Sequence, residues 1–325
     1  MSSDSLADVF SASARKRLES AVELIGPQPI TDFTTQQARA ALLEAEIMIT
    51  GWETPTIDGA VIASAPKLEA IVHAAGTVKT FLSEEVFDHG ILVTSCAAAN
   101  AIPVAEFTVA CIVFGLKRAN RFAHRLRTTH GVRSTEGMPR LGANNVTIGL
   151  VGASRVGREV IRLLRSYDVS VIVSDPYLSH GDAEQLGVQG VTLRELCMRS
   201  DVISVHAPLN ESTLGLIGAE QLALLHDGAV VINTARGALI DTAALEAELA
   251  TGRLDAYLDV TDPEPLPERS PLYGLPNVTL TPHIAGALGN EVLRLGDLAV
   301  AEVSRVAQGL PLEHEVRLSD LAHIA

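Results

Sequence analysis

The sequence predicts an α/β protein whose main sheet is parallel and carries helices on both faces. Short apolar runs rich in β-branched residues recur between residues 146 and 280, and segments with helical periodicity separate them. Parallel strands need connections of this kind. The run 169–173 is almost entirely β-branched, which is typical of a strand buried on both faces of a sheet.

The elements follow in a regular order. In the middle of the chain we expect strands at 146–151, 169–173, 201–205, 229–232, 255–258 and 278–280. We expect helices between them at 158–166, 193–199, 219–225 and 242–251. The first hundred residues repeat the alternation less clearly, with candidate strands at 47–50, 70–73 and 91–94 and candidate helices at 34–43 and 83–88.

Two long helices are expected to flank the middle block, at about 104–119 and 290–308. The second of them would return the chain toward its amino-terminal part. We therefore expect a doubly wound domain of residues 104–289 inserted into a smaller, discontinuous, flavodoxin-like α/β domain. That smaller domain would consist of residues 1–103 and 290–325.

Composition and charge exclude several classes of protein. The 325 residues are 47% hydrophobic, which is enough for two cores, and the formal net charge is −14. An acidic chain repels phosphate backbones, so we expect no nucleic-acid partner. The longest apolar runs, such as Val109–Leu116, are far shorter than the roughly 20 residues that cross a bilayer, so we expect no membrane span. No basic segment followed by an apolar one opens the chain, which predicts a cytoplasmic protein.

The three cysteines, Cys96, Cys111 and Cys197, are too few and too scattered for a disulfide framework. None belongs to a CxxC pair, and the chain contains no HExxH sequence. We therefore expect no metal site and interpret the cysteines as buried apolar residues of a reducing compartment.

A glycine-rich loop is the first chemical signal. Gly152, Ser154 and Gly157 form a G-x-S-x-x-G pattern that follows an expected strand and opens an expected helix. This is the context of a Rossmann-type dinucleotide site, in which the helix amino terminus binds the pyrophosphate. Ser154 stands where the middle glycine is usual, and an ordinary βα turn is the alternative. A hydrolase nucleophile elbow would need glycine at position 156, which is Val156.

Asp175 ends the next strand, 175 − 152 = 23 positions after the first glycine. A carboxylate there can accept hydrogen bonds from the ribose hydroxyls of NAD and would repel the 2′-phosphate of NADP. The alternative is a turn or helix-capping aspartate beside Pro176. Together, the loop and Asp175 favour NAD as the cofactor.

Polar residues follow three further strands, and their chemistry suits hydride transfer to a 2-oxo acid. Arg236 can bind the substrate carboxylate and polarise the ketone, and His283 can give a proton to the developing alkoxide. A nearby carboxylate, Glu264, would favour the charged imidazole. Each residue alone could be an ordinary loop residue; their joint order after a dinucleotide loop indicates a catalytic site.

From about Leu68 to Gly309 the chain resembles the D-isomer-specific 2-hydroxyacid dehydrogenase family. The resemblance implies that Arg236, Glu264 and His283 form the catalytic triad of an NAD-dependent oxidoreductase. The segments that carry it are the glycine loop, Val173–Tyr177, His206–Leu209, Asn233–Gly237, Leu258–Val260 with Glu264–Pro265, and Thr281–His283.

The same resemblance implies the remaining cofactor contacts. Arg155 and Val156 would contact the pyrophosphate, and Asp259 would bind the nicotinamide carboxamide. We also assign to this site the residues that lie in or next to the matching segments: Gly152, Ser154, Gly157, Asp175, His206, Pro208, Thr234, Ala235 and Gly286.

The amino-terminal part matches the family less closely. Ala75, Gly76 and Thr77 resemble a loop whose backbone N–H groups bind the substrate carboxylate, although Val78 replaces the usual aspartate. Trp52 could close the pocket over an apolar substrate side chain, or it could pack in the core of the smaller domain. The helix that begins near Val104 resembles one at the dimer interface of relatives, so we expect a homodimer through the NAD-binding domain.

Relatives that act on phosphorylated hydroxy acids tend to carry basic residues on the loop that corresponds to residues 49–55. This loop has no arginine, so the resemblance implies a small unphosphorylated 2-oxo acid as the substrate. The expected activity is therefore a D-2-hydroxyacid dehydrogenase or 2-oxo acid reductase. The alternative is a dinucleotide-sensing binding protein similar to the corepressors that keep this triad.

Overall fold

The computed structural model describes residues 1, 3–26 and 28–321. The chain forms two compact units. The discontinuous unit consists of Met1–Ala101 and Ala287–Ala325, and the middle unit of Ile102–Gly286. Both contain a parallel sheet and helices, which confirms the predicted α/β class.

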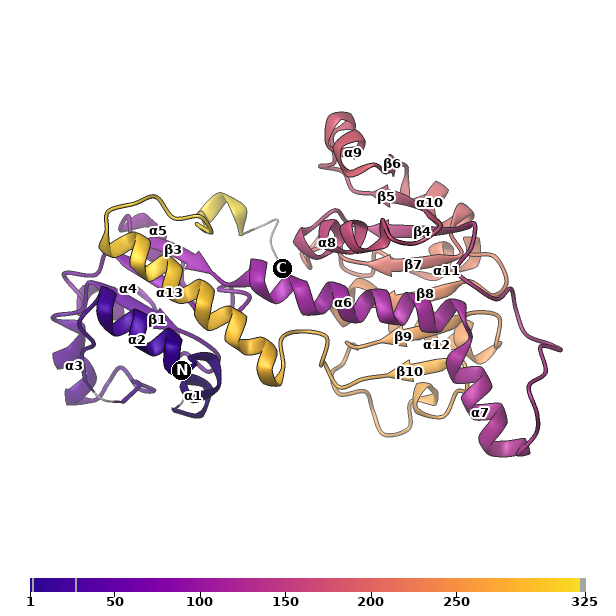
Figure 1. The fold of residues 1–325 in the computed structure, drawn as a ribbon, viewed down its shortest axis with the longest axis horizontal. Helices are drawn as coiled ribbons and strands as arrows, with labels where there is room; N and C mark the ends of the chain where they lie inside the picture. Colours follow the sequence, from indigo (N-terminus) through magenta and orange to yellow (C-terminus); the bar gives the residue numbers. More distant parts are fainter. Residues whose placement is uncertain (2, 27, 322–325) are drawn as a thin grey trace. The chain divides into compact units, whose positions relative to one another are not determined.

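The middle unit is built on a seven-stranded parallel sheet with the order β10-β9-β8-β7-β4-β5-β6 (Figure 1). The strands are β4 (Val146–Val151), β5 (Val169–Ser174), β6 (Gln189–Gly190), β7 (Val202–Val205), β8 (Val230–Asn233), β9 (Asp255–Leu258) and β10 (Val278–Leu280). The order of the strands reverses beside β4, which pairs with both β5 and β7. In open α/β sheets, ligands bind at the carboxyl ends of the strands next to such a reversal.

Helices cover both faces of this sheet. They are α6 (Ala97–Leu116), α7 (Ala119–Thr129), α8 (Arg155–Leu164), α9 (His180–Leu186), α10 (Leu193–Arg199), α11 (Ala219–Leu224) and α12 (Thr242–Ala250), with short 3₁₀ turns at Gly237–Leu239 and Pro271–Tyr273. One core combines buried residues of α6 and α8 with the sheet, and the other combines those of α10, α11 and α12 with it. The strands are apolar on both faces because each face has its own core.

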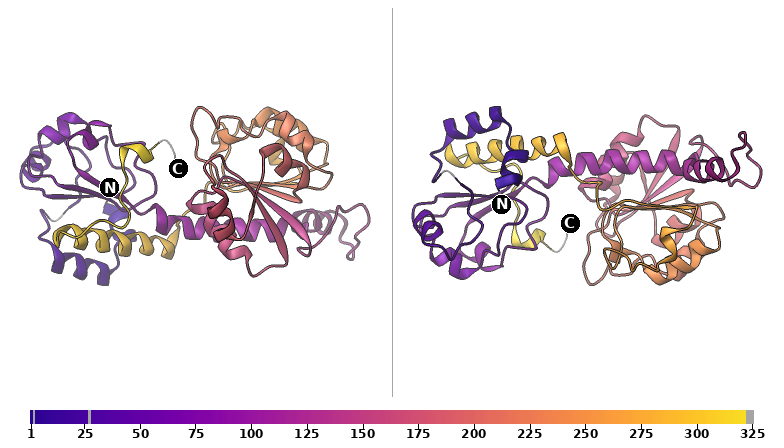
Figure 2. Two further views of the ribbon diagram at one scale, coloured as in Figure 1. Left: turned by 90° about the horizontal axis from the view of Figure 1, so that it is seen from above. Right: turned by 90° about the horizontal axis from the view of Figure 1, so that it is seen from below.

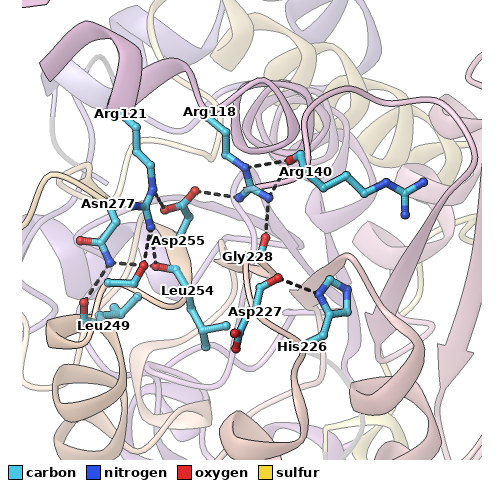
Figure 3. A network of polar contacts seen from close by, with 11 residues as sticks. Arg118, Arg121, Arg140, His226, Asp227, Gly228, Leu249, Leu254, Asp255 and Asn277 are labelled. Atoms are coloured by element: carbon cyan, nitrogen blue, oxygen red, sulfur yellow. Dashed lines mark hydrogen bonds and ion pairs between the residues drawn. The ribbon is translucent and has the colours of Figure 1, made fainter. Parts of the chain in front are cut away.

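The long helix expected at about 104–119 corresponds to α6, and a second helix, α7, begins where the expected helix ends. Helix α6 begins at Ala97, so Pro103 lies inside it, and it ends at Leu116. Arg118 then adopts a left-handed conformation, with φ of +54°, before α7 begins. A buried ion pair explains the break: Nη1 of Arg118 lies 2.7 Å from Oδ2 of Asp255, and Nε of Arg121 lies 2.5 Å from Oδ1 (Figure 3).

Among the described helices, α6 is long and apolar enough to cross a membrane by length and composition. Half of its most apolar stretch is nevertheless buried inside the protein. Ile112 and Leu116 pack in the core that α6 shares with β4 and β8. Helix α6 therefore has the packing of a core helix in a globular protein.

The discontinuous unit contains a three-stranded parallel sheet in which β2 lies between β1 and β3. Its strands are β1 (Ile47–Thr50), β2 (Ala70–His73) and β3 (Leu92–Ser95). Its helices are α1 (Ser3–Val9), α2 (Ala12–Ala21), α3 (Gln36–Leu42), α4 (Gly59–Ala63), α5 (Glu85–Asp88) and α13 (Leu293–Ala307), with 3₁₀ turns at Gly289–Val292 and Leu318–Asp320. Helix α13 corresponds to the helix expected at 290–308. Its first expected residues instead form the 3₁₀ turn Gly289–Val292.

Helices α1 and α2 are absent from the sequence prediction. Their apolar faces are short, and in α2 only Ala14 and Leu18 are buried. They fold against α13, which lies beside α2 in Figure 2. Gly296 of α13 permits this packing, because a Cβ atom there would lie 2.0 Å from the carbonyl oxygen of Val9.

Candidate active site

The glycine-rich loop connects β4 to α8 and has the geometry of a dinucleotide loop. Gly152 has φ of +103°, and a Cβ atom there would lie 2.6 Å from the backbone nitrogen of Ala207. A Cβ atom on Gly157 would lie 2.4 Å from the carbonyl oxygen of Gly152. Both positions therefore require glycine.

Ser154 is the N-cap of α8. Its Oγ accepts a hydrogen bond from the backbone N–H of Gly157 at 3.3 Å, and its hydroxyl hydrogen can still be donated. Helix α8 therefore begins three residues earlier than the sequence predicts. Arg155, in its first turn, is exposed, while Val156 packs partly against the core. The first N–H groups of α8 are the ones that can bind a pyrophosphate.

Asp175, just beyond β5, links this loop to the strand end. Its Oδ2 accepts from the N–H of Ala153 at 2.7 Å, and its Oδ1 accepts from the N–H of Tyr177 at 2.7 Å. The aspartate is thus a turn residue, as the alternative interpretation holds. Each carboxylate oxygen has a second lone pair, so Asp175 can also accept from ribose hydroxyls.

The next two strands end in buried polar side chains. His206, after β7, is 3% exposed, and burial lowers its pKa to about 4. Its Nε2 lies 2.9 Å from Oγ of Ser204, and its Nδ1 has no hydrogen-bond partner among the described residues. Thr234, after β8, shares a 2.7 Å hydrogen bond between hydroxyls with Thr108 of α6.

Three predicted catalytic residues lie on the loops after β8, β9 and β10. Nδ1 of His283 lies 2.8 Å from Oε1 of Glu264, and the two side chains are 50% and 44% exposed. Burial lowers the pKa of Arg236, and the nearby charge of Glu264 opposes that shift. Glu264 therefore lies close to both the imidazole of His283 and the guanidinium of Arg236.

Arg236 is oriented by its own loop. Its Nη1 donates to the carbonyl oxygen of Ala235 at 2.7 Å, and its carbonyl oxygen accepts from Nδ2 of Asn233 at 2.8 Å. Gly237 follows because a Cβ atom there would lie 2.0 Å from the carbonyl group of Thr261. The loop that presents the guanidinium thus packs directly against the segment after β9.

Asp259, the first residue after β9, is 2% exposed. Its carboxylate accepts from the hydroxyl of Thr281 and from the N–H groups of Ile284 and Ala285, at 2.6, 2.8 and 2.8 Å. These partners flank His283. Sequence reasoning assigned Asp259 only to the cofactor, and no local pattern in the sequence indicates contacts 22 to 26 residues away.

The predicted residues of the middle unit thus share one edge of its sheet. They follow the carboxyl ends of β4, β5, β7, β8, β9 and β10, and all of these strands are parallel. This common edge also includes Pro208, Ala235 and Gly286 on the same connections. An arginine, a carboxylate–imidazole pair and a dinucleotide loop can together bind a cofactor and protonate a substrate.

The discontinuous unit has a cavity of its own, of about 150 Å³. All the substrate-binding residues predicted in this unit line the cavity: Trp52, Ala75, Gly76 and Thr77. Trp52 is 40% exposed, so its ring lines the cavity and does not pack in the core. Of the other lining residues, Gly51, Glu53 and Thr54 belong to the early loop of residues 49–55, whereas the sequence indicated no role for His73, Thr80 or Phe81.

His73 is the buried polar group of this cavity. Its Nδ1 lies 2.9 Å from Oγ1 of Thr50, and its ring centroid lies 4.7 Å from that of Phe81. Burial lowers its pKa to about 4, and the amino-terminal ammonium group adds to the shift. The imidazole is therefore neutral at physiological pH.

Comparison with known proteins agrees with this geometry. The family model for the NAD binding domain of D-isomer specific 2-hydroxyacid dehydrogenases matches residues 109–285. A D-3-phosphoglycerate dehydrogenase of Archaeoglobus fulgidus is 32% identical over 82% of this chain and 50% of the relative. A glyoxylate reductase of Aeropyrum pernix is 32% identical over 79% of this chain and 78% of the relative.

Among solved structures, a phosphoglycerate oxidoreductase from Rhizobium etli aligns with a TM-score of 0.81 and 26% identity, over 96% of this chain and 94% of that one. The chain spans about half the length of the curated phosphoglycerate dehydrogenases that it matches. The middle unit is therefore a Rossmann-type NAD-binding domain. The chain belongs to the D-isomer specific 2-hydroxyacid dehydrogenase family.

Proposed function

We propose that the protein transfers a hydride between NAD(H) and a small unphosphorylated 2-oxo acid, or its D-2-hydroxy acid. The observation that supports this activity best is the placement of Arg236 and the His283–Glu264 pair on the sheet edge that carries the glycine-rich loop. A reductase needs a carboxylate-binding cation and a proton donor at the site of hydride transfer.

The residues of the middle unit have distinct roles in this reaction. NADH supplies the hydride when it is bound. Arg236 binds the substrate carboxylate and polarises the ketone. His283 donates a proton to the developing alkoxide, and Glu264, 2.8 Å from Nδ1, orients the imidazole.

The residues around the glycine-rich loop form the cofactor site. The first N–H groups of α8 bind the pyrophosphate, and Asp175 accepts from the adenosine ribose. The remaining contacts come from residues at the strand ends: Gly152, Ser154, Arg155, Val156, Gly157, His206, Pro208, Thr234, Ala235, Asp259 and Gly286.

The cavity of the discontinuous unit is the candidate substrate pocket of that unit, and Ala75, Gly76 and Thr77, which line it, can offer backbone N–H groups to a carboxylate. Among the described residues that line this cavity there is no lysine or arginine, and Glu53 is acidic. The negative charge of a phosphate group on the substrate would meet no cationic side chain among these lining residues. The name of the glyoxylate reductase relative, of which the chain covers 78%, agrees with an unphosphorylated substrate.

The test is a panel of 2-oxo acids with NADH, in which the loss of NADH absorbance is followed. We expect turnover of glyoxylate or pyruvate and little of phosphohydroxypyruvate. His283→Ala should abolish turnover and leave NADH affinity nearly unchanged. His180→Ala is the matched control, because the His180 side chain is 91% exposed on α9.

Tight NADH binding without turnover of any member of the panel would contradict the enzymatic function and favour a dinucleotide-sensing protein. Efficient turnover of phosphohydroxypyruvate alone would contradict the substrate assignment.

A further inference from the structure

The backbone at the proposed catalytic imidazole is in an uncommon conformation. His283 has φ of +55°, in the left-handed region that residues other than glycine rarely adopt. Such a conformation is unfavourable and persists only where the surroundings enforce it. The side chains of His283 and Glu264 are about half exposed, so packing alone does not fix them.

A buried carboxylate supplies the missing restraint. Oδ1 of Asp259 accepts from Oγ1 of Thr281, two residues before His283, and from the N–H of Ile284, directly after it. Oδ2 accepts from the N–H of Ala285. The N–H of His283 itself donates to the carbonyl oxygen of Asp259 at 2.9 Å. The residues on both sides of His283 are thus bound to one residue.

Asp259 also begins the segment that carries the imidazole's partner. Glu264 lies five residues after Asp259, beyond β9, whereas His283 follows β10. The two halves of the 2.8 Å pair therefore come from different loops, and Asp259 joins those loops at their bases. Loss of this junction would let the loops move independently.

We propose that Asp259 is a positioning residue for His283, in that it holds the Thr281–Ala285 segment so that the imidazole stays against Glu264. This inference rests on the proposed function for its kinetic consequences. The competing role is a contact with the nicotinamide carboxamide alone. That role would not require a hydrogen bond between Asp259 and Thr281.

Thr281 separates the two roles because it can be changed while Asp259 remains. Thr281→Val removes the hydroxyl donor at nearly constant volume, and Thr281→Ser retains it. We expect Thr281→Val to lower kcat about tenfold and Asp259→Asn about a hundredfold, as for a displaced catalytic group. NADH affinity of Thr281→Val should stay within about twofold of wild type, and Thr281→Ser should recover most of kcat.

A second measurement needs no turnover. The Nδ1–H proton of His283, hydrogen-bonded to Glu264, should give a low-field NMR resonance in protein labelled with ¹⁵N-histidine, assigned by its absence in His283→Gln. We expect this resonance to broaden or disappear in Thr281→Val and to persist in Thr281→Ser. If Asp259→Asn does not fold, the two Thr281 variants still decide the question.

Two outcomes would overturn the proposal. One is a wild-type resonance and wild-type kcat in Thr281→Val. The other is a loss of NADH affinity in Thr281→Val and Asp259→Asn that is as large as their loss of kcat. That result would show that Asp259 acts through the cofactor alone. Failure of the proposed function appears separately, as a wild-type protein that reduces no 2-oxo acid and yet shows the resonance.

Discussion

Individual buried histidines connect the chemistry of this protein to its stability. His206 in the middle unit and His73 in the discontinuous unit are each about 3% exposed, and burial lowers the pKa of each to about 4. Both imidazoles are neutral in the folded protein and free to take a proton when it unfolds. Protonation below the ordinary histidine pKa of about 6.5 therefore favours the unfolded state.

The first prediction concerns pH. The pKa of His206 is lowered in the folded protein, so above about pH 6.5 its imidazole is neutral in both the folded and the unfolded state and does not change the unfolding free energy. As the pH falls from about 6.5 toward about 4, the unfolded state takes up a proton that the folded state does not, and the unfolding free energy decreases. Between pH 7.5 and pH 5 this loss amounts to about 2 kcal/mol. His206→Gln should show a smaller loss in urea unfolding over this interval. The surface variant His180→Gln should behave as wild type, and equal pH dependence of all three proteins would contradict the assignment.

Asp175 carries the second prediction at this scale. Asp175→Asn removes the charge that repels a 2′-phosphate but keeps an oxygen for the N–H of Ala153, so the loop should persist. We expect the ratio of kcat/KM with NADPH to that with NADH to rise at least tenfold. Asp182→Asn, at a partly exposed site in the first turn of α9, is the matched control. A wild type that uses NADPH and NADH equally well would refute the role of Asp175.

At the scale of elements, most strands and helices of the middle unit follow from local patterns. Expected and observed strands agree within one residue at either end, as for β4 and β10, because continuous apolar runs define them. The two-residue strand β6 has no such run, and only its pairing with β5 creates it. The break between α6 and α7 is equally invisible in the sequence, because it depends on Asp255, 137 residues from Arg118.

The close approach of α8 to β4 gives a prediction about glycine. Gly157→Ala would place a Cβ atom 2.4 Å from the carbonyl oxygen of Gly152, so we expect a loss of about 1–3 kcal/mol in unfolding free energy and weaker NADH binding. Gly181→Ala on α9, where a Cβ atom meets nothing within 4 Å, should be neutral or slightly stabilising. Urea unfolding and NADH titration of both variants check this, and equal effects would contradict the packing argument.

The buried ion pair between Arg118, at the junction of α6 and α7, and Asp255 of β9 gives a second prediction about stability. Arg118→Ala leaves the carboxylate of Asp255 buried with Arg121 as its remaining cation, and it removes donors from the carbonyl oxygens of Gly228 and Arg140 (Figure 3). We expect the unfolding free energy to fall by about 3 kcal/mol. Arg127→Ala, on the exposed side of α7, should change it by less than about 0.5 kcal/mol. A loss in Arg118→Ala as small as in this control would show that the pair does not stabilise the fold.

For the protein as a whole, we propose a homodimer that associates through the middle unit. Helix α7 contains no buried residue among those described. Phe114 on α6, Leu126 on α7 and Val132 after it are 57%, 59% and 92% exposed. Apolar side chains exposed together on neighbouring segments are typical of association surfaces.

Light scattering after size exclusion tests this proposal. We expect a mass of two 34.4 kDa chains for the wild type and a shift toward one chain for Leu126→Glu. Leu24→Glu, at a leucine of the discontinuous unit that is 47% exposed, should leave the mass unchanged. A monomeric wild type, or a dimer indifferent to Leu126→Glu, would exclude this surface.

The α/β class, the glycine-rich loop and the residues at the strand ends could all be predicted from the amino-acid sequence. These features are local: a strand followed by a turn of fixed chemistry can be recognised within about ten residues. The proximity of Glu264 to His283 could be expected as well, because the carboxyl ends of parallel strands meet at one edge of the sheet.

The groups that hold the site in place became apparent from the folded arrangement alone. The three hydrogen bonds of Asp259, the buried His206 and the cavity around Trp52 and His73 join residues that are distant in the chain. Burial and long-range hydrogen bonds depend on the packed arrangement of several elements, and no local pattern of residues encodes them.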